Sequence, residues 1–313
     1  MLTGILAGLG AGALWGLVFV LPRMTPGLSA VDLTAGRFIS FGAVSAVAML
    51  LALRTRRLPN LQQALAALGM SVLGFTGYYL LLVLAIVDAG TEVPTLIIGT
   101  IPIWMMLLGK PLGLKWQSLA PGMALTLAGL ALMVMVMVNF GIDSAHSQPM
   151  QPLHPGQHQP LHTHYWRGIA FAVAAMACWT VFGLMNSAWL TRHTEVRATD
   201  WANWLGVATG VAALIMWIAA GSEAKVLLAL DNRSYLATML IVSGVGSAWV
   251  ATILWNIASQ QLSASLCGQL IVSETVFALV YSYGWDGQWP STLQVTACVL
   301  FILGILASIQ AHA

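Results

Sequence analysis

Long apolar runs alternate with short polar connectors along the whole chain. A helix needs about 20 mostly apolar residues to cross a bilayer, because every backbone N–H and C=O must be satisfied inside the segment. Strands of a membrane barrel would instead read as alternating runs of about ten residues. The continuous runs here predict an all-α polytopic membrane protein with ten transmembrane helices. The predicted spans are 3–22, 31–53, 62–87, 91–109, 118–140, 166–190, 200–220, 235–257, 262–283 and 291–310.

One long polar connector, residues 141–165, divides the chain into two groups of five spans. It is rich in Pro, Gln and His and buries too little apolar surface to fold alone. A shift of 164 residues places Trp15 on Trp179, and a shift of 173 residues aligns the fourth span with the ninth. Because five is an odd number of crossings, the second copy must enter the membrane from the opposite side. The sequence therefore predicts two inverted five-helix repeats, at 1–140 and 166–313, joined by an extracytoplasmic linker.

Composition agrees with a membrane protein. Of 313 residues, 59% are hydrophobic and 7% are charged, with a mean hydropathy of +0.85, whereas soluble domains are roughly a quarter charged. The net charge of +2 comes from connector residues and gives no indication of nucleic-acid binding. Cys178, Cys267 and Cys298 lie in apolar runs, so we expect buried hydrophobes rather than disulfides.

The distribution of Lys and Arg predicts the orientation. With the N-terminus inside, the inner connectors hold seven Lys or Arg residues and the outer ones hold four, with Arg37 set aside because it lies within a span. The cluster Arg54, Arg56 and Arg57 lies close to a span end, where the positive-inside rule has most force. Both termini are therefore predicted to be cytoplasmic. The first apolar run exceeds the length of a signal peptide, so we expect it to be a retained span.

The fourth and ninth spans carry polar and helix-breaking residues at membrane depth. Pro94 and Pro102 each remove a backbone donor and Gly99 weakens the helix between them, although tolerated kinks are the competing interpretation. In the ninth span Ser265, Gln269 and Ser273 form a polar edge at four-residue spacing, and Glu274 follows at mid-span. A charged carboxylate there costs several kcal/mol unless it is paired or wetted. The candidate substrate contacts on these two spans are Thr95, Gly99, Pro102, Gln269, Ser273 and Glu274.

The role of Glu274 has two interpretations. It serves proton coupling or binds a substrate amine, or it belongs to a structural ion pair. Arg37, about two turns into the second span, raises the same question. It can snorkel to the outer surface, pair with an acid such as Glu274, Asp88 or Glu92, or bind a substrate carboxylate. We expect a structural pair for Arg37.

Thirteen tryptophans are many for a chain of this length. Six of them lie near predicted span ends and are interpreted as interfacial anchors: Trp116, Trp166, Trp189, Trp201, Trp285 and Trp289. Other aromatic residues lie deeper, where helix packing and the wall of a substrate cavity are the two interpretations. The candidates for a cavity wall are Trp15, Tyr78, Tyr79, Trp179, Trp249 and Trp255, together with Asn256.

Two further patterns are interpreted as structural. Glycines at positions 4, 8, 12 and 16 recur at four-residue spacing, which predicts close packing of a neighbouring helix on the first span. Histidines at 146, 154, 158, 162 and 164 suggest metal ligands by composition, but Pro155 and Pro160 interrupt any helix there. We expect a solvated linker with no dedicated metal site.

Several segments together resemble a known family. They are ALWGLVFVLPR at 13–23, LTAGRF at 33–38, DAGTEVPTLIIGTIPIW at 88–104 and GKPLGLKW at 109–116. With the five-plus-five plan, they resemble the EamA-type branch of the drug/metabolite transporter superfamily over nearly the whole chain. Within it, the pair Trp255–Asn256 and the deep aromatic residues resemble the YddG-type exporters of aromatic amino acids.

The resemblance implies an inner-membrane carrier that exports small metabolites from a central cavity lined by spans 1, 3, 4, 6, 8 and 9. The small multidrug pumps of the same superfamily use a Glu in their first helix for proton exchange, but residues 3–22 contain no acid here. That coupling scheme is therefore not carried over. The leading hypothesis is a secondary transporter of amino acids or similar metabolites that works by alternating access, with kinked fourth and ninth spans as the moving parts.

The competing hypotheses are a drug or other metabolite exporter of the same fold, a membrane-embedded enzyme and a passive channel. The chain has no P-loop or H-E-x-x-H pattern, no obvious paired acids for an enzyme site and no recognisable charged ring or carbonyl filter. We expect no cofactor and no catalytic residues. The expected partners are a small-molecule substrate and membrane lipid, with no nucleic acid and with the monomer favoured.

Overall fold

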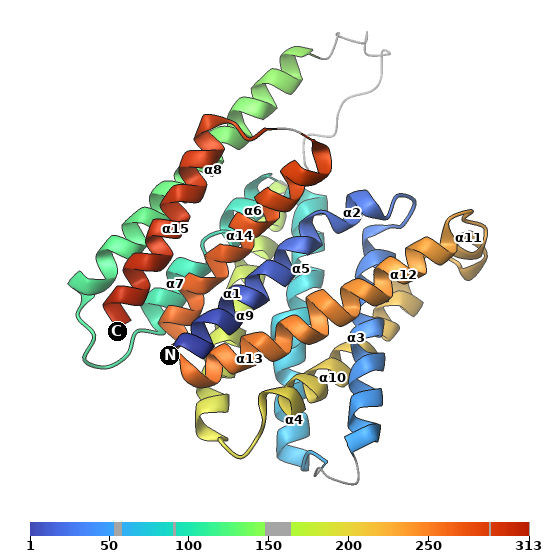
Figure 1. The fold of residues 1–313 in the computed structure, drawn as a ribbon. Coiled ribbons are helices and arrows are strands. Elements are labelled where there is room, and N and C mark those ends of the chain that lie inside the picture. Colours follow the sequence, from blue (N-terminus) through green and yellow to red (C-terminus); the bar gives the residue numbers. More distant parts are fainter. Residues whose placement is uncertain (53–57, 90–91, 148–163, 288, 313) are drawn as a thin grey trace.

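The computed structural model describes residues 1–52, 58–89, 92–147, 164–287 and 289–312, with the side chains of residues 92, 95, 137–147 and 286 left out. Within these residues the fold consists of helices and their connectors (Figure 1). The first half contains α1 Leu2–Gly16, a 3₁₀ turn Leu17–Phe19, α2 Leu21–Met24, α3 Ala30–Ala52, α4 Leu61–Ser71, a π-helical segment Val72–Thr76, α5 Gly77–Ala89, α6 Glu92–Ile98, α7 Ile101–Leu108 and α8 Trp116–Ser147.

The second half repeats this order with small differences. It contains α9 Tyr165–Arg192, α10 Ala198–Ala220, α11 Ala224–Leu228, α12 Arg233–Ser243, a π-helical segment Gly244–Val250, α13 Ala251–Gln261, α14 Ala264–Asp286 and α15 Thr292–His312. Nine helical stretches in the described residues are long and apolar enough to cross a membrane, and Leu96–Leu108 adds a shorter apolar helix. The prediction of an all-α polytopic membrane protein with ten spans is thus confirmed.

The fourth span is broken where the sequence predicts. α6 ends at Ile98 and α7 begins at Ile101. The carbonyl of Ile97 at the break accepts both the backbone N–H of Thr100, at 3.1 Å, and its hydroxyl, at 2.6 Å. Pro102 stands in the first turn of α7, where its missing N–H costs no helical hydrogen bond.

Three predictions about elements differ from the structure. The expected kink in the ninth span is wrong, because α14 runs unbroken from Ala264 to Asp286 with no proline to interrupt its hydrogen bonds. The side chain of Ser263 caps its start by accepting from the N–H of Leu266 at 3.2 Å. α8 also continues to Ser147, past the predicted span end at residue 140. The third and eighth spans contain the π-helical segments 72–76 and 244–250, which the sequence did not predict.

Helix packing follows the proposed relation between the two halves. α3 packs on α10, and α8 packs on α15, so equivalent second spans and equivalent fifth spans pair with each other. α5 packs on α9, and α13 packs on α1. Because α13 corresponds to α5 and α1 corresponds to α9, the second contact is the equivalent of the first with the two halves exchanged. The π-helical segments lie 172 residues apart, between 72 and 244. The structure thus contains paired features in both halves, while the boundaries of the two repeats stay a prediction.

Glycines allow the closest crossings. A Cβ atom on Gly42 of α3 would lie 2.6 Å from Cα of Gly210 on α10, so the two backbones touch. The glycine face of α1 packs on α14, where a Cβ on Gly16 would lie 2.9 Å from the backbone N of Ala278 (Figure 1). The predicted packing role of these α1 glycines is confirmed.

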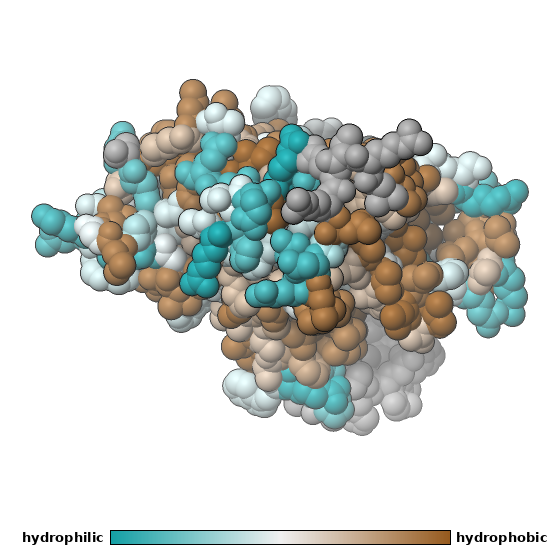
Figure 2. All heavy atoms as spheres, turned by 90° about the horizontal axis from the view of Figure 1, so that it is seen from below, coloured by the Kyte–Doolittle hydropathy of each residue, from teal (hydrophilic) through white to brown (hydrophobic). Residues whose placement is uncertain are grey.

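The surface matches the membrane assignment. Large hydrophobic side chains are exposed over most helices, and they cover much of the face in Figure 2, with hydrophilic groups gathered in separate areas. The interior instead buries many small polar side chains between helices, among them Ser45, Ser71, Thr209 and Ser259. This arrangement fits lipid outside and hydrogen-bonded helix contacts inside.

Candidate functional site

Three of the predicted deep tryptophans meet at the centre of the helix bundle. Trp15 of α1, Trp179 of α9 and Trp255 of α13 have ring centroids 5.4, 5.9 and 6.4 Å apart. We name them the tryptophan cluster. Trp15 and Trp179 keep partial exposure, whereas Trp255 is 1% exposed and its Nε1 has no hydrogen-bond partner. A buried donor without a partner is uncommon and calls for an explanation.

Phenylalanines extend the tryptophan cluster across the bundle. Trp179 contacts Phe182, and Phe182 contacts Phe75 of the first π-helical segment, at centroid distances of 6.0 and 5.5 Å. Phe75 in turn contacts Phe38 of α3 at 6.0 Å. The sequence reasoning missed these phenylalanines. Phe182 lies three residues after Trp179 and therefore on the same helix face, which is a signal that could have found it.

Charged and phenolic groups lie next to the far end of this aromatic path. Tyr79 of α5 packs against Phe38 at 6.4 Å, and the guanidinium of Arg37 lies 5.3 Å from the same ring centroid. Arg37 and Glu274 lie near enough for their charges to attract each other, and Tyr78 is close to Glu274. The structure thus brings together four of the predicted residues, from α3, α5 and α14.

Arg37 and Glu274 do not form a direct salt bridge within the described part of the chain. Nη2 of Arg37 donates to the backbone carbonyl of Ser247 at 3.0 Å, and its buried Nε has no partner. For Asp88, the suggested pairing with Arg37 is wrong. Asp88 instead accepts two hydrogen bonds from Arg167, from Nε at 2.7 Å and from Nη2 at 2.9 Å. The side chain of Glu92, the third suggested acid, is outside the described residues.

Asn256 lies in a fully buried polar network. Its Oδ1 accepts from Nδ2 of Asn186 at 3.1 Å, and its own Nδ2 donates to the carbonyl of Ala198 at 3.4 Å. Oδ1 of Asn186 accepts from Nε1 of Trp201 at 2.7 Å. In this conformation the network connects α9, α10 and α13, and Asn256 is fully buried within it rather than facing open space.

The polar edge of α14 is also buried between helices. Nε2 of Gln269 donates to Thr126 of α8 at 2.8 Å, while its Oε1 has no partner. Ser273 donates to the carbonyl of Leu270 at 2.6 Å and packs against Gly12. Glu274, one residue further, is partly exposed and accepts no hydrogen bond from the residues described. Of the three predicted α14 contacts, only Glu274 is accessible in this conformation.

The remaining candidates occupy different places. Nε1 of Trp249 donates to Asn203 of α10 at 2.7 Å, and Trp249 stays partly exposed. Gly99 lies in the break of the fourth span and Pro102 is buried in the first turn of α7. The side chain of Thr95 lies outside the described residues, as does the linker 148–163 with three of its histidines. No group of three or more metal-binding side chains occurs among the residues that the structure describes.

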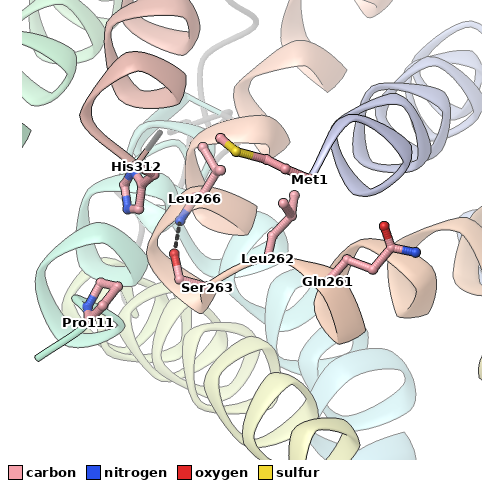
Figure 3. Close-up of a pocket in the computed structure, with 7 residues that line it drawn as sticks. All are labelled: Met1, Pro111, Gln261, Leu262, Ser263, Leu266 and His312. Carbon is pink, nitrogen blue, oxygen red and sulfur yellow. Dashed lines mark hydrogen bonds between the residues drawn. The ribbon is translucent and has the colours of Figure 1, made fainter.

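A separate pocket lies at the end of the bundle where both termini meet. It has a volume of about 220 Å³. Its lining residues are Met1, Pro111, Gln261, Leu262, Ser263, Leu266 and His312 (Figure 3). None of the candidate substrate contacts lines it. Figure 3 shows Leu266 between Met1 and His312, and Leu266 belongs to α14.

The fold and this site define a multi-pass helical membrane protein with an aromatic and charged centre, a construction suited to a small-molecule carrier. Residues 2–137 match the model of the EamA-like transporter family. The inner membrane protein YtfF of Escherichia coli (strain K12) is 28% identical over 324 residues, which is 99% of this chain and 96% of that protein. A crystal structure with 20% sequence identity superposes with a TM-score of 0.72, over 99% of this chain and 98% of the other, which shows a shared fold.

Together these matches make the chain similar to EamA-like transporters over its first half and to YtfF over nearly its whole length. The family match supports the resemblance over residues 2–137, and membership of the family stays a prediction. The finer resemblance to YddG-type exporters of aromatic amino acids is not tested by a match to YtfF and stays a prediction.

Proposed function

We propose that the protein is a secondary transporter that exports aromatic amino acids or similar small amphipathic metabolites across the inner membrane. It works as a monomer, by alternating access through a central cavity. The observation that carries this proposal is the tryptophan cluster, because its members come from α1, α9 and α13, in both halves of the chain. Aromatic walls suit a substrate with an aromatic or cationic part.

Local helix irregularities support a moving site. The break between α6 and α7 and the two π-helical segments all lie in spans that contact the centre, and each segment contributes a group to it. Phe75 belongs to the first π-helical segment, and the Ser247 carbonyl that anchors Arg37 belongs to the second. π-helical turns occur frequently at functional sites, and broken helices at membrane depth are typical of transporters.

The competing functions make different predictions. A drug exporter of the same fold would move lipophilic cations through the same aromatic cluster. A membrane enzyme would need paired reactive groups, and a passive channel would conduct without saturation. The similarity to the EamA-like transporter family favours a carrier over a membrane enzyme or a passive channel.

Flux through purified protein in liposomes tests the proposal. Vesicles loaded with labelled phenylalanine, tryptophan or tyrosine should release it with saturable kinetics, and vesicles with a lipophilic cation should not. Trp179→Ala should lower the flux at least tenfold, because it removes the ring shared by both parts of the aromatic path. Trp289→Ala is the matched control, since that residue is 95% exposed and lies in the connector between α14 and α15. No movement of any amino acid would overturn the proposed substrate class.

A further inference from the structure

Arg37 and Glu274 are two opposite charges inside the membrane-spanning part that lack a direct ionic partner. Each would be costly at this depth without compensation, so charged residues in such positions are paired or face a cavity. Their charges attract each other without forming a salt bridge in the described residues. Each group is therefore only partly compensated, and both lie next to the aromatic path.

We propose that Arg37 and Glu274 recognise the two charges of a zwitterionic amino acid, with Arg37 binding the carboxylate and Glu274 binding the ammonium group. This inference rests on the proposed function, because it assigns the substrate's charged end to one part of the same site. The tryptophan cluster and the phenylalanines then receive the side chain.

The surroundings of Arg37 suit a carboxylate. Nη2 is held by the Ser247 carbonyl, and the guanidinium lies over the ring of Phe38, so its orientation is fixed before a ligand binds. Nε remains without a partner, which leaves donor capacity on the guanidinium. Arginine binds carboxylates through paired N–H donors in a fixed plane, which adds specificity as well as affinity.

The surroundings of Glu274 suit an ammonium group. Gly12 and Gly16 bring α1 against the backbone of α14 at this residue, since added Cβ atoms would lie 3.1 Å from Glu274 N and Glu274 O respectively. α1 thus packs closely on the backbone at Glu274, while the carboxylate accepts no hydrogen bond from described residues. Tyr78 lies nearby and supplies a further polar group.

A structural interpretation of the same pair predicts a different behaviour. If Arg37 and Glu274 only compensate each other, neutralising either one destabilises the protein but does not change which charged ligands bind. If Glu274 only carries protons, Glu274→Gln changes the pH dependence of transport and leaves discrimination between ligands intact. A zwitterion site instead requires that each substitution weakens binding of the ligands that carry the complementary charge.

Ligand binding to the purified full chain tests this, with tryptophan fluorescence as the readout. The probes are phenylalanine, phenethylamine, which lacks the carboxylate, and phenylpropanoate, which lacks the ammonium group. The wild type should bind phenylalanine at least about tenfold more tightly than either analogue, because each analogue loses a charge-assisted contact. Equal affinities, or absence of phenylalanine binding, would overturn the inference without any variant.

Variants then show which residue binds the carboxylate end of the ligand and which binds the ammonium end. Arg37→Gln should lower the affinity for phenylalanine and phenylpropanoate about tenfold or more and change that for phenethylamine little. Glu274→Gln should spare phenylpropanoate and weaken the two amines. Arg37→Lys, which keeps the charge but loses the planar fork, should fall between wild type and Arg37→Gln. Arg167→Gln and Glu223→Gln, whose partners lie elsewhere, should leave all three affinities unchanged.

The outcomes separate this inference from the proposed function. Equal loss of all three ligands in the Arg37 and Glu274 variants, with a monodisperse protein in size-exclusion chromatography, would contradict the zwitterion site. Should both variants misfold, the wild-type ligand series and Arg37→Lys decide alone. If phenylalanine binds with the predicted preference but is not transported in liposomes, the transporter proposal fails while the site stands.

Discussion

Two buried tryptophans differ in how their indole N–H groups are satisfied. Trp201 is fully buried and donates to Asn186 at 2.7 Å, whereas the equally enclosed Trp255 has an Nε1 without a partner. Removing a donor that makes a hydrogen bond leaves its buried acceptor unpaired. Removing a buried donor that has no partner instead removes the desolvation cost of that donor. The two residues therefore respond differently to the same substitution.

We predict that Trp201→Phe lowers the free energy of unfolding by about 2 kcal/mol more than Trp255→Phe, because both lose the same ring volume but only Trp201 leaves Asn186 Oδ1 unpaired. Thermal unfolding of the two variants in the same detergent measures this difference. Phenylalanine affinity should change in the opposite order, with a larger loss for Trp255→Phe. Equal stability of the two variants would contradict the assigned hydrogen bonds.

Depth along a span could be predicted from the sequence, but the helix face could not. Trp15, Trp179 and Trp255 were expected to lie deep, and they do, yet their mutual contacts depend on three helices that are distant in sequence. Trp201 was expected to anchor at the interface, which is wrong, since it is fully buried. Trp189 stacks on it with ring centroids 3.7 Å apart and stays partly exposed. Trp166 and Trp289 are largely exposed, as expected for anchors.

At the scale of elements, the crossing of α3 and α10 depends on two glycines. We predict that Gly42→Ala destabilises the protein by roughly 2 kcal/mol or more, because the new methyl group meets the Gly210 backbone and no flexible side chain can move away. Gly69→Ala is the matched control. A Cβ at Gly69 meets nothing within 4 Å, and Ala is the better helix former by about 1 kcal/mol. Thermal unfolding should therefore rank Gly42→Ala lowest and Gly69→Ala at or above wild type.

The same two helices are also joined at one end by a buried carboxylate. Asp32 at the start of α3 accepts hydrogen bonds from Ser222 N at 2.9 Å, Ser222 Oγ at 2.6 Å and Trp217 Nε1 at 3.0 Å. Its equivalent after a shift of 168 residues is Asp200, in the first turn of α10. The buried acid is thus satisfied by Trp217 of α10 and Ser222 directly after α10, together with Ser29 of its own half.

We predict that Asp32→Ala lowers the free energy of unfolding by about 2 kcal/mol, because three donors on the α10 side lose a charged acceptor. Asp231→Ala, at an exposed position in the following connector, is the control and should change stability little. Thermal unfolding in detergent measures both. A similar loss in both variants would show that the Asp32 contacts contribute nothing specific.

Element boundaries show which sequence signals are reliable. The break in the fourth span was predicted from Pro94, Gly99 and Pro102, because proline and glycine act directly on the backbone. The kink expected in α14 had no such residue and is absent. The π-helical segments at 72–76 and 244–250 shift the hydrogen-bond pattern by one residue without a proline, so no residue type indicated them. Only their occurrence in both halves connects them to the proposed repeat.

At the scale of the whole molecule, the number of crossings fixes the relation between the chain ends. Met1 and His312 line the same pocket, so both termini lie at one end of the bundle (Figures 1 and 3). Ten is an even number of crossings, so the chain must end on the side of the membrane where it began. Asp32 starts the second span and therefore lies one crossing away from Met1, and its partner Ser222 lies at that same far end.

We predict that the end with the termini is cytoplasmic, since the Lys and Arg residues of the predicted inner connectors outnumber those of the outer ones by seven to four. In a background with Cys178, Cys267 and Cys298 replaced, Glu223→Cys should react with a membrane-impermeant maleimide in intact spheroplasts. Gln117→Cys, in the first turn of α8 and near the Pro111 side of the terminal pocket, should react only after permeabilisation. Both positions are exposed, so accessibility and not burial decides the result. The opposite labelling pattern would invert the orientation, and because export requires substrate entry from the cytoplasm, the α11 end would then have to admit the substrate.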